Sequence, residues 1–588
     1  MGFRYHAVGR QSRPMLFIKI LKRWPAPSPT AKTLSVIRSL RLNMFLICKF
    51  IQGTNKIKFD NMVKRLFILG AVLFSSINFL SAQITFQKTF GGTENDVCHS
   101  IQQTSDGGYI LAGWTYSFGA GAEDIYLIKT NVNGDSLWTK TFGGINHEDA
   151  FFIQQTADGG YLTTGYTVSF GAGNNDIYLI KTDANGDLLW TKSFGGLSFD
   201  AGYEVLQTID GGYIITGTIY SSGSNDVCLI KTDANGDSLW TKTFGGTGND
   251  LGNSIQQTTD GGFIISGFTS SFGAGGYDIY LIKTDVNGNL LWTRTFGGAL
   301  EDKGNSVQQT TDGGYIICGW TLSFGAGAEN VYLIKTDING NLLWSKTFGG
   351  TIVEEGYSVQ QTTDGGYIIA GNTFSFSATG SETNFYLIKT DANGDSLWTK
   401  TFGGADNDEA NSVHQTMDGG YIIGGSTYSF GSGFSDFYLV KTDSLGNSGC
   451  NESGTPTIVT SPATQMSSPA SIVGSANVTV TSPATVVGSG GVVSPICTTV
   501  GFNIIDSDNS FVISPNPSAG NFNISFESTI VNGNIEIFNT IGEKVLSVNI
   551  SSESKKVINL DKISGGIYFV KVFNGEKYSC KKIIIERD

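Results

Sequence analysis

Acidic side chains recur at one position of a repeated motif and are the first candidates for chemistry in this sequence. The motif is Thr-Phe-Gly-Gly, with Ser for Thr in one copy, and an acid follows its second glycine by four residues. Carboxylate oxygens bind calcium, and they also fix tight turns by accepting backbone N–H groups. These seven residues, called the rim acids below, are Asp96, Glu148, Asp200, Asp250, Asp302, Glu354 and Asp408.

Uniform repetition of the rim acids favours the turn role, because a catalytic pair would be confined to one or two copies. Two such charges about 10 Å apart in water repel by only roughly 0.4 kcal/mol, so no cation is needed to hold them near one another. We therefore predict neither a metal nor another cofactor, and calcium at the rim acids is the alternative. A second polar position, predicted on the same face, reads Asp124, Asp176, Asp226, Asp278, Asn330, Asn384 and Asp436.

Other catalytic groups are few. The histidines that follow residue 82 fall in three different copies, and no second His or Cys stands at metal-ligand spacing from them: His99, His147 and His414. No serine elbow, Cys/His arrangement or phosphate loop is present. An enzyme remains the alternative to a binding protein, as a polysaccharide lyase or hydrolase using an adjacent acidic pair, Glu301/Asp302 or Glu354/Glu355.

The elements that must position these residues form a long internal repeat. The copies begin at Thr89, Thr141, Ser193, Thr243, Thr295, Thr347 and Thr401, at spacings of 50 to 54 residues, and self-similarity at this period indicates a repeat architecture. Asp-Gly-Gly and Asn-Gly turns separate four β-prone runs in each copy. In the second copy the runs are Phe151–Thr156, Tyr161–Val168, Asp176–Thr182 and Leu188–Phe194. Four short antiparallel strands per copy are typical of a propeller blade.

The ends of the array indicate how it closes. The seventh copy stops after its third run, and the missing fourth run stands at the other end, in Ile84–Gly92. Pairing this strand into the last copy would remove an open edge. We predict an all-β, seven-bladed β-propeller over residues 83–447, with four-stranded blades and the N-terminal strand closing the last blade. Each fourth run except this one carries a tryptophan expected in the core: Trp138, Trp190, Trp240, Trp292, Trp344 and Trp398.

The segment before the repeats predicts export. Residues 1–61 are basic and unpatterned, and we interpret them as a translated upstream region. Residues 62–82 have the charged start, apolar core and small-residue end of a signal peptide, with cleavage expected between Ala82 and Gln83. The apolar run is too short to favour a stable membrane span. The remaining chain has 24 Lys and Arg against 50 Asp and Glu, which disfavours nucleic acid as a partner.

Residues 448–500 differ in composition from the repeats. They consist largely of Ser, Thr, Val, Pro and Gly, and Thr460–Thr464 nearly repeats Thr481–Thr485. We predict an extended linker with local strand character, and a small β-solenoid is the alternative. Cys450 and Cys497 bracket this segment and are predicted to form a disulfide in an oxidising compartment.

Residues 501–588 are predicted to be a second all-β domain, a β-sandwich. Three motifs occur in order, Ser-Pro-Asn-Pro-Ser-Ala-Gly, Gly-Gly-Ile-Tyr-Phe-Val-Lys-Val and Lys-Lys-Ile-Ile-Ile, with Pro515, Asn516, Pro517, Gly520, Gly565, Gly566 and Tyr568 as their defining residues. Together they resemble the C-terminal sorting domain of the Bacteroidetes type IX secretion system. The resemblance implies recognition by that secretion machinery, a place outside the cell or on its outer surface, and proteolytic removal of the domain.

The predicted propeller and the resemblance to a sorting domain together indicate an exported binding or adhesion protein. The variable loops between strands lie on one face of such a propeller, and we expect them to engage an extracellular polysaccharide or protein.

Overall fold

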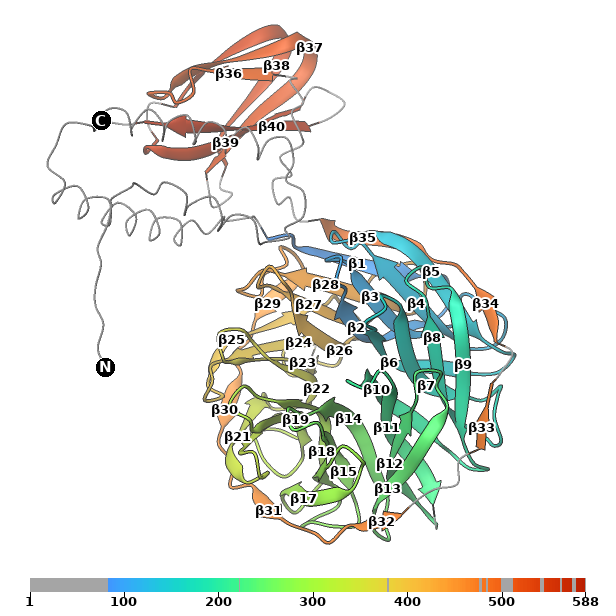
Figure 1. Cartoon of the computed structure of the whole chain (residues 1–588). Coiled ribbons are helices and arrows are strands. Elements are labelled where there is room, and N and C mark those ends of the chain that lie inside the picture. Colours follow the sequence, from blue (N-terminus) through green and yellow to red (C-terminus); the bar gives the residue numbers. More distant parts are fainter. Residues whose placement is uncertain are drawn as a thin grey trace, which may run out of the picture. The chain divides into compact units, whose positions relative to one another are not determined.

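The computed structural model describes residues 83–586 except for 222, 378–379, 475–478, 483–484, 499–510, 540–543, 561–562 and 574–577. The predicted upstream region and signal peptide lie outside the described residues. Every regular element of the described part is a β-strand (Figure 1), as the all-β prediction requires. None of these residues forms a helix of the length and hydrophobicity that a bilayer span needs.

Each repeat opens with two strands joined by the Asp-Gly-Gly turn, in which the first glycine has a positive φ, as at Gly159 (85°). The first strands are β2 (Asp96–Gln103), β6 (Glu148–Gln155), β10 (Ala201–Gln207), β14 (Asp250–Gln257), β18 (Asp302–Gln309), β22 (Glu354–Gln361) and β26 (Asp408–Gln415). The second strands are β3 (Tyr109–Thr115), β7 (Tyr161–Thr167), β11 (Tyr213–Ser221), β15 (Phe263–Thr269), β19 (Tyr315–Thr321), β23 (Tyr367–Thr373) and β27 (Tyr421–Thr427).

The third strand of each repeat is apolar on both faces, and most of these strands are buried along their whole length. These strands are β4 (Asp124–Thr130), β8 (Asp176–Thr182), β12 (Ser224–Thr232), β16 (Asp278–Thr284), β20 (Asn330–Thr336), β24 (Asn384–Thr390) and β28 (Asp436–Thr442). The fourth strands, which alternate polar and apolar residues, are β5 (Ser136–Gly143), β9 (Leu188–Gly195), β13 (Ser238–Gly245), β17 (Leu290–Gly297), β21 (Leu342–Gly349) and β25 (Ser396–Phe402). For the seventh repeat, β1 (Phe86–Gly91) takes this position beside β28, as predicted.

The segment expected to be an extended linker instead adds a fifth strand to every repeat sheet. We call residues 450–498 the strap. It comprises β29 (Glu452–Gly454), β30 (Ile458–Thr460), β31 (Gln465–Ser467), β32 (Ile472–Gly474), β33 (Thr479–Thr481), β34 (Val486–Gly488) and β35 (Val492–Thr498). These strands pair with β25, β21, β17, β13, β9, β5 and β1 in turn. The described repeats therefore form seven five-stranded antiparallel sheets, with the strap along their outer edges (Figure 1).

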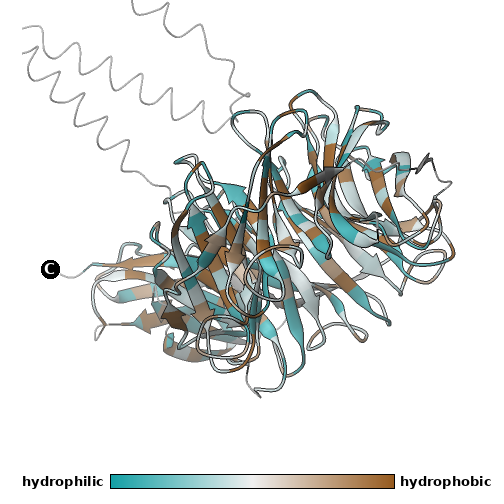
Figure 2. Cartoon of the chain, turned by 90° about the horizontal axis from the view of Figure 1, so that it is seen from below, coloured by the Kyte–Doolittle hydropathy of each residue, from teal (hydrophilic) through white to brown (hydrophobic). Residues whose placement is uncertain are grey.

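Neighbouring sheets pack through aromatic side chains and repeated hydrogen bonds. The tryptophan of one sheet contacts a tyrosine of the next, as Trp138 does Tyr161 at 5.7 Å between ring centroids. A glutamine at the end of each first strand accepts an N–H from the Asp-Gly-Gly turn of the preceding repeat; Ser105 donates to Gln155 in this way, at 2.8 Å. Bands of hydrophobic residues cross the strands of successive sheets (Figure 2).

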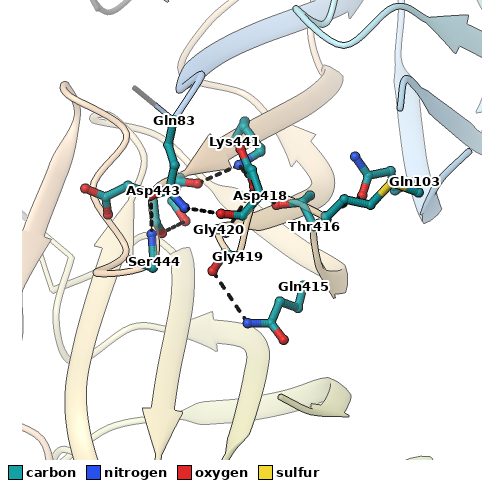
Figure 3. A network of polar contacts seen from close by, with 12 residues as sticks. Gln83, Gln103, Gln415, Thr416, Asp418, Gly419, Gly420, Lys441, Asp443 and Ser444 are labelled. Atoms are coloured by element: carbon teal, nitrogen blue, oxygen red, sulfur yellow. Dashed lines mark hydrogen bonds and ion pairs between the residues drawn. The ribbon is translucent and has the colours of Figure 1, made fainter. Parts of the chain in front are cut away.

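The same contacts join the last sheet to the first. The N–H of Met417 donates to Gln103 Oε1 at 2.9 Å, and the Phe86 ring lies 6.1 Å from that of Tyr109, in the place that tryptophan takes elsewhere. Beside this junction Gln83 is held to the last repeat, since its Nε2 donates to the carbonyl of Asp418 and its Oε1 accepts from the N–H of Ser444 (Figure 3). The predicted first residue of the exported chain is therefore hydrogen-bonded to the last repeat.

The C-terminal domain has its own hydrophobic core. Its strands are β36 (Phe511–Ser514), β37 (Asn521–Asn539), β38 (Lys544–Asn559), β39 (Gly566–Phe573) and β40 (Tyr578–Ile585). The sequence predicted a sandwich of two sheets, but these strands form one continuous, barrel-like sheet, because the long β37 pairs with β36 and β38 in its first half and with β38 and β39 in its second. A register shift between Ser525 and Ile530 divides the two halves.

Candidate functional site

The rim acids lie at the starts of the first strands and clamp the turns that precede them. All are buried. Asp302 shows the arrangement: its Oδ2 accepts the N–H of Gly298 at 2.7 Å and the hydroxyl of Ser323 at 2.8 Å. Glu354 makes the same bond to the N–H of Gly350, also at 2.7 Å. Each rim acid therefore joins the Gly-Gly turn to a later part of its own repeat.

Burial raises the pKa of Asp302, although hydrogen bonds from Thr321, Gly298 and Ser323 oppose the rise. At Asp408 the same cause raises the pKa to about 6. The rim acids stand on separate repeats and are bonded to protein donors, so they do not gather the roughly six to eight oxygen ligands that calcium takes. Among the described residues no group of three or more His, Cys, Asp or Glu side chains could hold a metal ion.

The two adjacent acidic pairs considered for catalysis do not converge. In each pair one member, Asp302 or Glu354, is buried in the turn clamp. Glu301 is an exposed loop residue whose carboxylate lies 3.8 Å from Lys303 Nζ. Glu355 accepts a hydrogen bond from the hydroxyl of Tyr357 at 2.6 Å. Consecutive strand residues point to opposite faces of a sheet, which separates Glu354 from Glu355.

A cavity of about 290 Å³ lies between the first strands, and residues of all seven repeats line it. One column of the repeat, three residues after the rim acid, contributes a different mixture of side chains from each copy: His99, Phe151, Tyr203, Asn253, Asn305, Tyr357 and Asn411. Three of them form an aromatic arc, with ring centroids 5.3 Å apart for His99 and Phe151 and 5.2 Å for Phe151 and Tyr203. The amides occupy most of the remaining repeats.

The next column gives the cavity an ionisable group. It is serine in most copies, and its hydroxyl accepts an N–H from the next sheet, as Ser254 does from Val307 at 3.1 Å. The third copy has Glu204 here, whose Oε2 accepts the N–H of Ile255 at 2.8 Å. Burial raises the pKa of Glu204 to about 7, against opposing hydrogen bonds from Ile255 and Ser254. The cavity lining therefore changes charge near neutral pH.

Three acids near the rim acids, Glu329, Glu355 and Glu409, stand at positions that are not acidic in every copy. Burial, together with the charge of Glu355 and a hydrogen bond to it, raises the pKa of Glu329 to about 7. The carboxyl group of Glu329 therefore keeps its proton to a higher pH than an ordinary glutamate does. Burial also raises the pKa of Glu409, and the charge of Glu355 adds to this.

On the aromatic side of the cavity, His99 Nε2 lies 3.3 Å from Asp149 Oδ2. Burial would lower the pKa of this histidine, but the charge of Asp149 and its hydrogen bond outweigh burial and raise it.

Sequence reasoning missed the cavity, although a signal for it was present. The column three residues after the rim acid lines the cavity and varies from copy to copy, whereas the rim acids repeat: it reads His99, Phe151, Tyr203, Asn253, Asn305, Tyr357 and Asn411. The loops that precede these strands also expose apolar side chains, with Ile145 at 80% and Leu197 at 84% exposure. A comparison of the copies for columns that vary, in place of columns that repeat, would have identified this surface.

The sorting motifs meet in the C-terminal sheet. Asn516, between Pro515 and Pro517, bridges to β40, because its Nδ2 donates to the carbonyl of Lys582 at 2.8 Å and its Oδ1 accepts from the N–H of Ile584 at 2.9 Å. The carbonyl of Gly520 accepts from the N–H of Leu560 at 2.7 Å.

The Gly565-Gly566 pair stands where β39 begins, and Gly566 has a φ of 156°. Tyr568 is buried in the same strand, and its hydroxyl donates to the carbonyl of Ser564 at 2.9 Å. All three motifs therefore contribute to one sheet.

Cysteines divide into two kinds. Cys98, Cys228 and Cys318 are free and buried in the repeat sheets. Cys450 is disulfide-bonded. Its predicted partner, Cys497, lies opposite Gln87 in the pairing of β35 with β1, and the Gln87 side chain donates to the carbonyl of Cys450 at 2.5 Å. The backbone thus brings both ends of the strap to one residue of β1, and the Cys450–Cys497 pairing stays a prediction.

Comparison with known proteins identifies the family of the C-terminal domain. Residues 512–586 match the family model described as "Secretion system C-terminal sorting domain". This domain marks proteins that the type IX secretion system delivers, as in the Bacteroidetes, to the cell surface or beyond it. The protein is accordingly a secreted or outer-surface protein.

The chain is also similar to other proteins over part of its length. A stretch of 114 residues is 30% identical to the regulatory protein FlaEY of Caulobacter vibrioides, covering 18% of this chain and 12% of that protein. Among solved structures, the extracellular domain of a hybrid two-component system from B. thetaiotaomicron aligns at 11% identity and a TM-score of 0.33, over 85% of this chain and 57% of that one. Sqt1 from Chaetomium thermophilum aligns at 12% identity and a TM-score of 0.36, over 61% and 99% respectively.

Proposed function

We propose that the seven repeat sheets are the blades of a closed β-propeller. We also propose that this exported protein binds a polysaccharide or protein ligand through the cavity and through the loops on the side of the rim acids. The hydrogen bond from each Asp-Gly-Gly turn to the next repeat's glutamine occurs seven times, and the seventh joins Met417 to Gln103. That cycle supports closure.

One observation carries the binding proposal: the column three residues after each rim acid lines the cavity, and its side chains differ from copy to copy. Residues that hold the fold repeat in every copy, such as the rim acids, because every sheet needs the same turn. The cavity instead combines an aromatic arc from His99 to Tyr203 with amides at Asn253 and Asn305. Aromatic faces take the apolar side of a sugar ring, and amides bond its hydroxyl groups. A peptide with polar side chains would use the same groups.

The test is a glycan array combined with calorimetric titration of every glycan that binds, using the chain from Gln83 onwards. Tyr203→Ala should weaken binding of a positive glycan at least tenfold. Leu189→Ala, which changes an exposed side chain on an outer strand, should leave it unchanged. Equal affinity of the wild type and Tyr203→Ala for every ligand found would contradict binding in the cavity.

A polysaccharide lyase or hydrolase is the second candidate, and the raised pKa of Glu329 beside Glu355 favours it. A carboxyl group that keeps its proton near neutral pH can serve as a general acid. The same glycans should then be assayed for product release. Loss of turnover in Glu355→Gln with retained binding would favour the enzyme, whereas no turnover by the wild type would leave the binding function.

A further inference from the structure

We propose that the strap is a covalently closed belt: a disulfide between Cys450 and Cys497 joins its two ends across β1, so that the chain encircles the seven repeat sheets and locks them. The proposal rests on the closed arrangement proposed above. It goes beyond it, because it adds a covalent closure to the strand pairing of β1.

The path of the strap is the first argument. Its strands visit the sheets in reverse order of the repeats, from β25 of the sixth repeat through β5 of the first, and the last strand, β35, pairs with β1 of the seventh. The strap leaves the seventh sheet after β28 and returns to the same sheet. A segment that starts and finishes on one sheet, after pairing with each of the other six, makes one complete circuit.

The register is the second argument, because the step from sheet to sheet is nearly constant. Each fourth strand has one phenylalanine in its Phe-Gly motif, and the residues paired with these phenylalanines advance by seven positions at every step except the last, which is six. They are Glu452, Val459, Met466, Val473, Val480, Val487 and Val493. Three residues of each step pair with a sheet, and the others span to the next one.

Hydroxyl contacts match this step and show that the strap is fitted to the sheets. Buried tyrosines of the third strands bond strap threonines seven residues apart, as Tyr386 does Thr457 and Tyr332 does Thr464. The third repeat has Cys228 in place of this tyrosine, and the seven-residue step reaches Val478 in the sequence, which has no hydroxyl group. Residue 478 lies outside the described part, so this correspondence is one of sequence.

The ends of the strap meet on one side chain of β1. Gln87 Nε2 donates to the Ser448 hydroxyl at 2.8 Å and to the carbonyl of Cys450 at 2.5 Å, and Cys497 is paired opposite Gln87 from β35. Cys450 is oxidised in the structure. Forming the bond removes one proton and one electron from each of the two thiols, and the electrons pass to a protein disulfide oxidant of the extracytoplasmic compartment, which becomes a dithiol.

A closed belt opposes separation of the first and last sheets even when β1 is strained. Opening the array would require either breaking the disulfide or stripping the strap from several outer edges at once. Cys98, Cys228 and Cys318 in the repeat sheets are free thiols, so they offer a reductant no disulfide, whereas the bond of Cys450 does.

The experiment uses the exported chain with its sorting domain. Peptide mapping without reduction should recover a Cys450–Cys497 cross-link, and dithiothreitol should lower the Tm by roughly 5 °C, since the bond closes a loop of about 50 residues. The variant with Cys450→Ser and Cys497→Ser should melt at this lower temperature, and dithiothreitol should not change its Tm. Cys98→Ser is the matched control and should keep the full response to dithiothreitol.

Amide hydrogen exchange separates the two proposals. Strong protection of β1 and of the Met417 N–H in the oxidised protein, together with the redox-dependent Tm, supports the belt. If β1 is protected but the Tm is the same in both redox states, or if Cys450 is linked elsewhere, the belt is wrong and the closed propeller stands. If β1 exchanges freely in the oxidised protein, the closed arrangement fails and the belt fails with it.

Discussion

Glu204 occupies a position where most copies have serine, and it replaces the serine hydroxyl with an ionisable carboxyl group. Its carboxylate accepts the same inter-sheet N–H that the serine hydroxyls accept in the other repeats. Burial raises its pKa to about 7 from an ordinary value of 4.5. The folded protein therefore holds this proton more tightly than the unfolded chain, so stability falls as the pH rises from about 4.5 to about 7 and then levels off.

Replacement of Glu204 by glutamine should remove this dependence. The amide oxygen can still accept from Ile255, but the side chain no longer carries a charge. Urea unfolding should show the variant gaining on the wild type by on the order of 2 to 3 kcal/mol between pH 4.5 and pH 7.5. The exposed Glu94→Gln serves as the control and should follow the wild type at both pH values. Parallel pH profiles for Glu204→Gln and the wild type would show that Glu204 does not titrate in this range.

At the scale of elements, β1 is the strand on which two other parts of the chain converge. It lies between β28 and β35, and its Phe86 fills the inter-sheet position that tryptophan fills elsewhere. The exposed fraction of Phe86 is 2%, so the ring is as buried as the core around it. Phe86 and the equally buried Phe90 both belong to the hydrophobic core at this junction.

Substitution Phe86→Ala should cost about 3 to 5 kcal/mol, the range for removing a buried phenylalanine. The loss should appear in urea unfolding as a lower midpoint. Ile84→Ala, two residues earlier and outside the core, should cost less than about 1 kcal/mol. A midpoint for Phe86→Ala that equals that of Ile84→Ala would argue against a sealed junction.

Strands with strong local patterns could be predicted from the sequence. The run Asp176–Thr182 is bounded by turn residues and apolar on both faces, and β8 has the same limits. The pairing of β1 followed from counting the runs. The strap could not be predicted in this way, because its strands are mostly three residues long and too short for a period-two pattern. Their pairing also depends on edges that lie from about 50 to about 400 residues away in the sequence.

The candidate site followed a similar division. The rim acids were visible because they repeat, and their turn contacts agree with the role that repetition favoured. The pairing of Glu329 with Glu355 was not visible, since the two residues belong to different repeats and meet only when neighbouring sheets pack. Glu204 stood out from its column, but nothing in the sequence placed that column in a cavity.

At the scale of the whole molecule, the repeat sheets contain the cavity, and the C-terminal domain contains the secretion signal. The sorting domain has a separate core, and Asn516 ties its first motif to its last through β40. Its role is delivery, and its sequence contributes no residue to the cavity.

A fusion of a signal peptide, a reporter and residues 501–588 should reach the surface of a host with a type IX secretion system. The same fusion without Lys581–Asp588, which removes most of β40 and the partners of Asn516, should remain in the periplasm. Surface labelling of intact cells measures both. Retention of the complete fusion, or display of the shortened one, would contradict delivery by this domain.

The nearly constant advance of the strap ties the length of one region of the gene to the number of copies in another. A duplication that inserted an eighth repeat would leave one outer edge bare unless about seven codons were also added near residues 452–498. Loss of a repeat would leave about seven residues of the strap without a sheet to pair with. Relatives with a different number of repeats should therefore have tails that are longer or shorter in multiples of about seven residues, so that tail length alone counts the sheets.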